Sequence, residues 1–205
     1  MEKEENRNTE QAILKAAEEV FLEKGFVGAK TTEIASRAGI NHAMLHYYFR
    51  TKENLFNIVF QRKIELLATS LSKVFSQEVP FFDKIRIAVE THFDFVAANP
   101  RLLFFIYSEV INAPERRKQL KERVFPIAFG ILSRLGIEMK EEAAKGTIRP
   151  IEPLELILNI ISLNVITFLA HPLISELNLD QDVIRRILKL RKESNAAFII
   201  NGLKA

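Results

Sequence analysis

The sequence predicts an all-α protein. Its 205 residues include only seven glycines, and most of its prolines fall between segments of helical periodicity rather than within strands. The hydrophobic content of 48% is sufficient for a substantial core. The length of 205 residues predicts one compact unit or two small ones, and no internal repeat or low-complexity segment is present.

The period of the apolar residues and the prolines at helix ends or first turns predict the individual helices. These cover residues of about 9–24, 31–38, 42–48, 52–76, 81–98, 101–111, 115–142, 153–171 and 181–203. Pro126 falls inside one of them, so that helix is expected to kink or to be divided there. The stretch from Lys145 to Pro153, which contains Gly146, is the clearest loop.

The most informative segment runs from Lys30 to Lys52, KTTEIASRAGINHAMLHYYFRTK, and predicts two short helices joined by a tight turn. Ala35 is small enough for the second helix to cross close behind it, and Gly39 can adopt the positive φ that ends the first helix. Leu45 then fills the angle between the two helices. The remaining members of this small core are Ile34, Ala38 and Ile40.

The second of these helices is predicted to start at His42, directly after Asn41, a residue type that favours the N-cap position. Leu45, Tyr48 and Phe49 recur at the spacing of one helix face, which is expected to point inward. The outward face then consists of His42, Ala43, His46 and Tyr47, with Met44 on its flank. A helix of this size fits the major groove of B-DNA, where its side chains would reach base edges.

Helix-turn-helix geometry also occurs in packed helical proteins that do not bind nucleic acid. Local charge helps to distinguish the two cases. Seven basic residues lie between Lys24 and Lys63 against only two acidic ones, Glu33 and Glu53, which gives this stretch a charge of +5. The whole chain carries +3, so the remainder is slightly acidic. Positive charge concentrated around an exposed helix indicates a phosphate-binding face.

The segment from about Thr9 to Leu55, roughly a quarter of the chain, resembles the DNA-binding domain of the tetracycline-repressor-like (TetR) family of transcriptional regulators. The resemblance rests on an ordered set of residues: Glu23-Lys24-Gly25-Phe26, Ile34-Ala35, Ala38-Gly39-Ile40, Leu45, Tyr48-Phe49 and Lys52-Glu53-Asn54-Leu55. Two positions depart from the family. His46 stands where the family most often has tyrosine. Lys30 stands where it commonly has a small hydroxyl cap, which moves the expected N-cap to Thr31.

The resemblance implies a helix-turn-helix DNA-binding domain over residues 1–51 and a helical effector-binding and dimerisation domain over residues 52–205. The side chains expected in the DNA groove are His42, Ala43, Met44, His46 and Tyr47. Those expected on the DNA backbone are Thr31, Thr32, Tyr48 and Lys52, and Asn41 at the start of the recognition helix completes the candidate DNA-binding set. Lys52 follows a Thr51 cap, and a cation there, together with free backbone N–H groups, favours a phosphate. The alternative is a lysine that is merely solvated.

The C-terminal helices indicate how the chain assembles. The predicted helix 153–171 is apolar almost all round, and the helix 181–203 carries a second apolar face opposite its basic residues. Such helices must be covered on more than one side. We therefore expect a homodimer with a four-helix interface, the alternative being that both helices are buried within one chain. A dimer would read a palindromic operator with half-sites about 34–36 Å apart or a multiple of that distance. The long predicted helix 52–76, about 37 Å in length, would connect effector and DNA domains.

The region 81–171 is rich in phenylalanine with scattered polar residues, which suggests a site for a small hydrophobic effector carrying one or two polar groups. The candidate effector-binding residues are His92, Phe104, Tyr107, Phe129, Asn164 and Phe168. The plainer interpretation is that phenylalanines at helical spacing form the core and that His92 is a hydrogen-bonded structural residue.

Other classes of function have little support. The chain has no cysteine, so neither a disulfide nor a zinc–thiolate site is expected. His42 and His46 have the i, i+4 spacing of metal ligands, but no acidic residue flanks them as in a zinc protease. We therefore predict no enzyme activity, no cofactor and no metal. The polar N-terminus and the polar residues that interrupt 154–170 favour a soluble, cytoplasmic protein without a membrane span. The favoured function is a ligand-responsive repressor; the alternative is an all-helical hydrophobe-binding protein without operator specificity.

Overall fold

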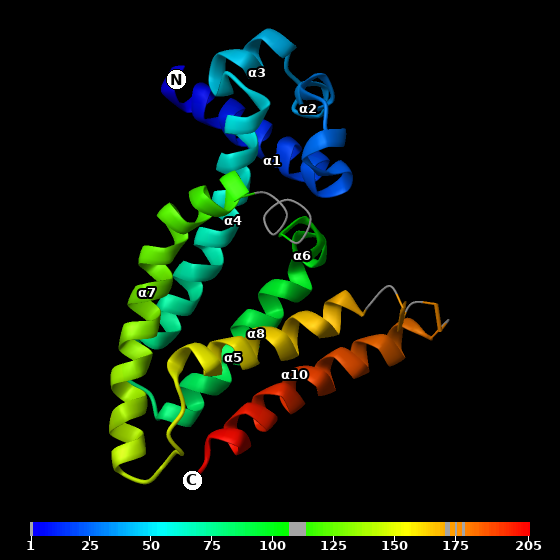
Figure 1. Ribbon diagram of the computed structural model, residues 1–205. Helices are drawn as coiled ribbons and strands as arrows, with labels where there is room; N and C mark the ends of the chain where they lie inside the picture. Colours follow the sequence, from blue (N-terminus) through cyan, green and yellow to red (C-terminus); the bar gives the residue numbers. More distant parts are fainter. Residues whose placement is uncertain (1, 107–113, 171–172, 175, 178) are drawn as a thin grey trace. The chain divides into compact units, whose positions relative to one another are not determined.

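The computed structural model describes residues 2–106, 114–170, 173–174, 176–177 and 179–205. Within these ranges the chain is helical, and its only β-type pairing is an isolated bridge between Ile148 and Lys204. The helices are α1 (Glu2–Gly28), α2 (Thr31–Arg37), α3 (His42–Phe49), α4 (Lys52–Phe75), α5 (Phe81–Ala98), α6 (Pro100–Ile106), α7 (Pro114–Ala144), α8 (Pro153–Leu169) and α10 (Gln181–Leu203) (Figure 1). The predicted all-α fold is confirmed.

Most predicted boundaries agree with the structure to within two residues, because apolar period, caps and prolines are local signals. The exception is α1, which begins at Glu2 rather than at Thr9. Its first residues are good helix formers but include no apolar residue, so no period marks them. The last part of the helix predicted to span 101–111 lies outside the described residues.

Pro126 does not divide α7. The helix is continuous from Pro114 to Ala144 with Pro126 inside it, so of the two expected outcomes, a kink or a division, the division is wrong. A proline removes one backbone donor and clashes with the carbonyl four residues earlier, a cost that the rest of a 31-residue helix can offset.

Contacts group the chain into two compact units. Unit 1 comprises Met1–Leu66 and Phe104–Lys121, and unit 2 comprises Leu67–Leu103 and Glu122–Ala205. Helix α4 therefore contributes its first part to unit 1 and its second part to unit 2. The predicted boundary after residue 51 separates DNA binding from effector binding and dimerisation. It stays a prediction.

Unit 1 is built around an aromatic cluster that joins α1 to α4. Gly25 adopts φ 67° inside α1 and breaks its regular geometry. Phe26, which follows it, lies edge to face with Phe56 at 4.9 Å between ring centroids, and Phe56 lies edge to face with Phe21 at 5.0 Å. Edge-to-face packing is the arrangement that aromatic quadrupoles prefer. The cluster fixes α4 on α1, which provides the platform for α2 and α3.

Unit 2 is a helical bundle in which α5, α8 and α10 pack against one another (Figure 1). Its main core includes Ile85 of α5, Leu135 of α7, Leu156 of α8 and Leu203 of α10, all almost fully buried. The predicted loop before α8 is confirmed. It is attached to the end of α10, where the Arg149 N–H donates to the Leu203 carbonyl at 2.9 Å. No helix among the residues described here is both long enough and apolar enough to cross a bilayer.

Candidate nucleic-acid interface and effector site

The turn between α2 and α3 has the predicted geometry. Gly39 adopts φ 70°, a conformation that an L side chain would strain, and the N–H groups of Gly39 and Ile40 close the turn on the carbonyls of Ser36 and Ala35. Ile34, Ala35 and Leu45 are buried in the angle between the helices. The small core of the motif is therefore the predicted one.

Helix α3 presents the predicted outward face. The Asn41 side chain caps the helix by accepting a hydrogen bond from the Met44 N–H at 2.8 Å. Leu45 and Phe49 are buried, whereas Tyr47 keeps 71% of its surface exposed. The other side chains of the outward face are also exposed, namely His42, Ala43, Met44 and His46. These side chains are free to enter a groove without any rearrangement of the helix.

The end of α3 is a strained turn that restrains His46. Arg50 adopts φ 62° and ψ −56°, and the Thr51 N–H donates to the Phe49 carbonyl at 2.6 Å. This is a γ-turn, a conformation of positive φ that is uncommon and costly for a non-glycine residue. The His46 Nδ1–H donates to the Arg50 carbonyl at 2.8 Å. Because a carbonyl only accepts, His46 Nδ1 carries a proton, and Nε2 remains available on the exposed face.

The start of α2 differs from the expectation. Lys30, not Thr31, is the N-cap residue, with an extended backbone and no side-chain cap. Thr31 is the first helical residue, and its hydroxyl shares a hydrogen bond with His42 Nε2 at 2.9 Å. The threonine hydroxyl therefore links α2 to α3. This contact joins residues 11 apart in the chain, so a local cap rule does not anticipate it.

Tyr48 connects α3 to the beginning of α1. Its hydroxyl donates to the Asn6 side chain at 2.6 Å, and the Tyr48 ring lies edge to face with Tyr47. Asn6 lies before Thr9, where the first helix was predicted to begin, and so was not among the predicted site residues. No local signal could have shown this contact, which spans 42 residues.

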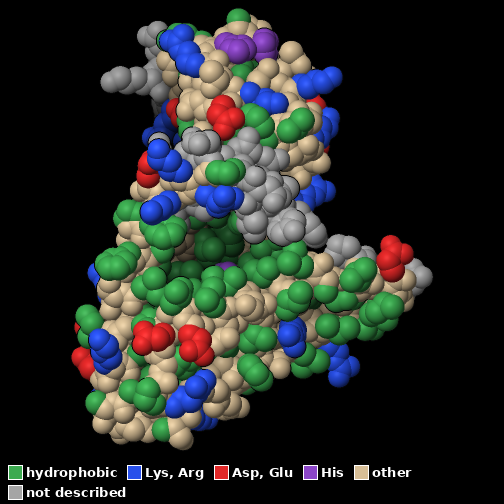
Figure 2. Space-filling view, in the orientation of Figure 1, with side chains coloured by type: hydrophobic (Ala, Val, Ile, Leu, Met, Phe, Trp, Pro, Cys, Tyr) green, Lys and Arg blue, Asp and Glu red, His purple; other side chains and the backbone are tan. Residues whose placement is uncertain are grey.

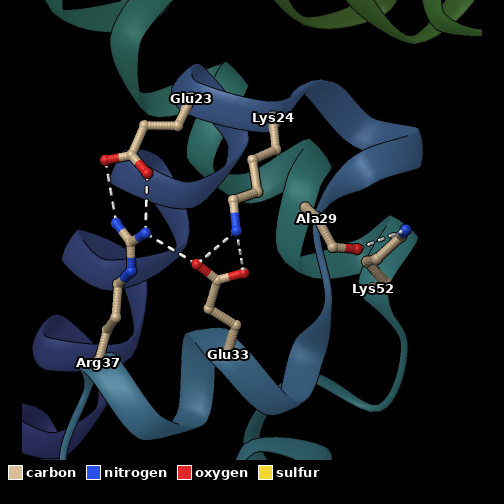
Figure 3. A network of polar contacts seen from close by, with 6 residues as sticks. All are labelled: Glu23, Lys24, Ala29, Glu33, Arg37 and Lys52. Atoms are coloured by element: carbon tan, nitrogen blue, oxygen red, sulfur yellow. Dashed lines mark hydrogen bonds and ion pairs between the residues drawn. The ribbon is translucent and has the colours of Figure 1, made fainter.

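The charges around the motif are partly neutralised by a network between α1 and α2. Lys24 pairs with Glu33 at 2.7 Å, and Arg37 pairs with both Glu23 and Glu33 at 2.8 Å (Figure 3). The bond from Lys24, assisted by Arg37, lowers the pKa of Glu33, and the two carboxylates raise the pKa of Arg37. All four side chains are at least partly exposed to solvent, so the network orients the helices more than it stabilises them.

The local charge of +5 therefore overstates the free positive charge. Arg62 pairs with Glu10 and Lys63 with Glu18, and both of these glutamates lie on α1 outside the stretch that was counted. Lys30 and Arg50, which flank α2 and α3, make no ion pair within the described part of the chain. Both are therefore candidates for contact with a phosphate.

Lys52 has a structural partner. Its ammonium donates to the Ala29 carbonyl at 2.9 Å (Figure 3). The same ammonium lies 4.5 Å from the centroid of the Phe26 ring. The predicted Thr51 cap is present, since the Thr51 hydroxyl accepts from the Asn54 N–H at 3.1 Å. An ammonium has three donors, so Lys52 can hold the end of α1 and still donate to a phosphate. The alternative of a merely solvated lysine does not hold.

We expect Lys52→Met to lower the free energy of unfolding by about 1–2 kcal/mol, because the buried Ala29 carbonyl loses a charged donor and Phe26 loses its cation. Chemical denaturation measures this loss. Lys30→Met is the matched control, and we expect its unfolding free energy to stay within about 0.5 kcal/mol of the unchanged protein. Equal stability of both variants would show that Lys52 does not hold the two segments together.

Helices α8 and α10 of unit 2 leave apolar side chains exposed (Figure 2). On α8 these include Leu154, Leu158 and Ile161, and on α10 they include Val183, Ile187, Leu190 and Phe198. Their spacing of about one or two turns places each set in a stripe along its helix. The alternative that a single chain buries both helices completely is wrong, because the opposite faces already fill the core.

The candidate effector residues are only partly brought together. His92 of α5 is 6% exposed and lies 3.1 Å from the side chain of Asn164 on α8, and Phe168 contacts Phe93 at 5.0 Å between ring centroids. Phe129 is 71% exposed on α7, so it does not line this buried group. Phe104 lies on α6 and belongs to unit 1. Tyr107 lies outside the described residues.

The buried polar group has a further member, Asn195, that was not among the predicted residues. Asn195 of α10 donates from Nδ2 to the Asn164 side-chain oxygen at 2.9 Å and faces the Leu163 carbonyl at 3.2 Å. Its position beside Ala196 on the apolar face of the helix was the available signal. Burial lowers the pKa of His92 to about 4, so the imidazole is neutral at pH 7. In the part of the chain that is described, no group of three or more side chains could hold a metal ion.

The fold and the exposed α3 define a helix-turn-helix protein with a helical C-terminal domain. The sequence pattern of the bacterial regulatory proteins of the tetR family matches residues 13–59, the segment that forms the motif. Residues 13–59 therefore form a DNA-binding domain of the tetR family of bacterial regulatory proteins.

Two curated relatives support this assignment. The transcriptional activator FasR of Mycolicibacterium smegmatis is 29% identical over 60% of this chain and 58% of its own length. The fatty acid metabolism regulator protein of Bacillus subtilis is 23% identical over 67% of this chain and 69% of its own length. The match to FasR thus spans less than two thirds of that relative.

A solved structure supports the fold over nearly the whole chain. The transcriptional regulator FadR from Bacillus subtilis, crystallised in complex with stearoyl-CoA, superposes with a TM-score of 0.67. It is 19% identical, and the match covers 94% of this chain and 98% of that one. At this identity the likeness establishes the shared fold.

Proposed function

We propose that this regulator is a homodimeric repressor that binds a palindromic operator and releases it when a hydrophobic effector enters unit 2. The observation that carries the DNA-binding part is the outward face of α3, which projects polar and aromatic side chains from a helix whose other face is buried. The cations Lys30 and Arg50 flank the motif, and DNA binding depends on such phosphate partners.

The division of labour within the interface follows from exposure. We infer that His42, Ala43, Met44, His46 and Tyr47 contact base edges in the major groove, with Asn41 fixing the start of the helix. Thr31, Thr32, Tyr48 and Lys52 are proposed to contact the DNA backbone. We add Lys30 and Arg50 to the backbone contacts.

We propose a homodimer through α8 and α10. The exposed stripes on both helices would be covered if each subunit contributed the same pair, forming a four-helix interface. A two-fold axis matches a palindromic operator and brings two recognition helices to one site.

The relatives suggest the class of effector. One is named as a regulator of fatty acid metabolism, and a protein of the same fold was crystallised with stearoyl-CoA. We therefore propose a long-chain acyl thioester, which combines an apolar chain with a polar head. A coupling of about 1–3 kcal/mol between effector and operator would lower operator affinity roughly 5- to 150-fold. No catalytic step is part of this proposal, because the family consists of regulators.

Selection of bound genomic fragments, followed by gel shifts, tests this function. We expect one preferred palindrome and an affinity that falls with salt at a log–log slope of about −0.9 per phosphate neutralised. Stearoyl-CoA should then lower the operator affinity; a rise would contradict release of the operator by this effector. Weak binding that is uniform across sequences would favour a hydrophobe-binding protein without operator specificity.

We expect His46→Ala and Tyr47→Ala each to lower operator affinity by about 5- to 100-fold, because each removes a side chain that would contact base edges. Gel shifts on the selected palindrome and on random DNA measure the change, and circular dichroism checks the fold. Lys15→Ala, an exposed substitution on α1, is the control and should bind as the unchanged protein does. If both α3 variants kept full operator affinity, the assignment of the groove face would be wrong.

A further inference from the structure

His92, Asn164 and Asn195 form a buried hydrogen-bonded group. Backbone carbonyls determine which atoms in this group donate and which accept. Asn164 Nδ2 lies 2.9 Å from the Val89 carbonyl, and Asn195 Nδ2 lies 3.2 Å from the Leu163 carbonyl. Because a backbone carbonyl only accepts hydrogen bonds, each amide must present its NH2 group to that carbonyl. The two carbonyls can only accept, so they determine the orientation of both asparagine side chains.

The orientation of Asn164 in turn selects the tautomer of His92. The second hydrogen on Asn164 Nδ2 points to His92 Nδ1 at 3.1 Å, and the oxygen of the same amide is occupied by Asn195. His92 Nδ1 must therefore be the acceptor. The proton of a neutral imidazole then lies on Nε2. Burial keeps this imidazole uncharged at pH 7, since it lowers the pKa of His92 to about 4.

The Nε2–H group of His92 has no hydrogen-bond partner among the residues that the structure describes. The hydrogen bonds of His92 within the described residues involve only Nδ1. Yet no buried side-chain nitrogen or oxygen there lacks a partner, so the 6% of His92 that remains exposed must include Nε2. A side chain that is 94% buried thus leaves a single polar hydrogen accessible to solvent and available to an acceptor.

The surroundings restrict the acceptor to an uncharged group. Phe93 and Phe168 lie beside this polar group, and burial keeps His92 neutral at pH 7. A carboxylate buried there would need a counter-charge that neutral His92 does not supply. A carbonyl oxygen needs only a donor.

We infer that His92 Nε2–H donates a hydrogen bond to an uncharged carbonyl oxygen of the effector, such as that of an acyl thioester or ester, and that Asn164 and Asn195 orient it for this purpose. This inference rests on the proposed function, in which a hydrophobic effector enters unit 2. It names the atom that distinguishes an acyl thioester from a molecule with the same chain but no carbonyl.

A matched pair of ligands tests the inference on the full-length protein. The first is stearoyl-CoA, and the second is S-octadecyl-CoA, a thioether that has the same chain and head but lacks the carbonyl. We expect the unchanged protein to bind the thioester about 5- to 100-fold more tightly by calorimetry. His92→Phe should bind both ligands alike. His92→Gln, which retains an N–H donor, should recover part of the preference.

If His92 had a purely structural role, His92→Phe would bind both ligands more weakly by the same factor. The ratio of the two affinities would then stay unchanged. Equal binding of the two ligands to the unchanged protein, a preference that persists in His92→Phe, or no binding of either ligand would each overturn the inference. Gel shifts without ligand measure operator selectivity separately. They test the proposed DNA-binding function independently of these results.

Nitrogen-15 spectra of the histidine side chains give a readout that needs no variant. At pH 7 we expect His92 to carry its proton on Nε2, and this proton resonance should move when stearoyl-CoA is bound. A proton on Nδ1, or an Nε2 resonance that stays unchanged in the stearoyl-CoA complex, would contradict the assignment even if His92→Phe failed to fold.

Discussion

Replacing Phe198 by glutamate is expected to produce a monomer and to lower operator affinity about 100-fold or more. Phe198 is 69% exposed in the single chain and lies on the apolar stripe of α10. In the proposed four-helix interface, its replacement would bury a carboxylate without a partner, which costs several kcal/mol. A monomer offers one recognition helix, and losing base contacts worth about 3 kcal/mol or more corresponds to the expected fall in affinity.

Sedimentation and gel shifts measure the two effects together. Ile137→Glu is the matched control, because it places the same charge on an exposed apolar residue of α7 rather than on α8 or α10. We expect this control to remain dimeric and to bind operator normally. A Phe198→Glu protein that stays dimeric with full operator affinity would place the interface elsewhere.

The second large effect is a loss of stability in acid that originates at His92. Burial lowers the pKa of the folded imidazole to about 4, whereas an unfolded histidine has a pKa of about 6.5. Below pH 6.5 the unfolded chain therefore binds a proton that the folded chain does not. The free energy of unfolding should fall as the pH decreases from 6.5 to 4, by about 3 kcal/mol in total.

Other groups also titrate in this range, so the contribution of His92 is measured as the difference in unfolding free energy between two proteins. Urea unfolding of the unchanged protein and of His92→Gln at several pH values isolates the contribution of the imidazole. We expect the stability advantage of the unchanged protein over the variant to be constant above pH 6.5 and to shrink toward pH 4. Parallel curves for the two proteins would show that His92 takes up its proton equally in both states.

Much of the DNA-binding motif could be predicted because its signals are local. The Gly39 turn, the Asn41 cap and the inward Leu45 each depend on residues within a few positions, and the structure has all three. The N-cap at Thr31 was wrong because the choice between adjacent residues depends on a partner farther along the chain. In the structure this partner is His42.

The charge of the motif could not be judged from its own stretch of sequence. Glu10, Glu18 and Glu23 lie on α1, and only folding brings them to Arg62, Lys63 and Arg37. The same holds for Lys52, whose partner Ala29 is 23 residues away. Neutralisation of charge is a long-range property, whereas a count of charges is a local one.

The sequence by itself determined the helices, the helix-turn-helix and the apolar surplus of the last two helices, because period, caps and composition act over one or two turns. Tertiary structure decided which polar groups meet. Asn164 lies 72 residues from His92 and 31 from Asn195, and the direction of their hydrogen bonds follows from the Val89 and Leu163 carbonyls. Packing sets these pairings, since a buried polar group must find its partner wherever the fold has placed one.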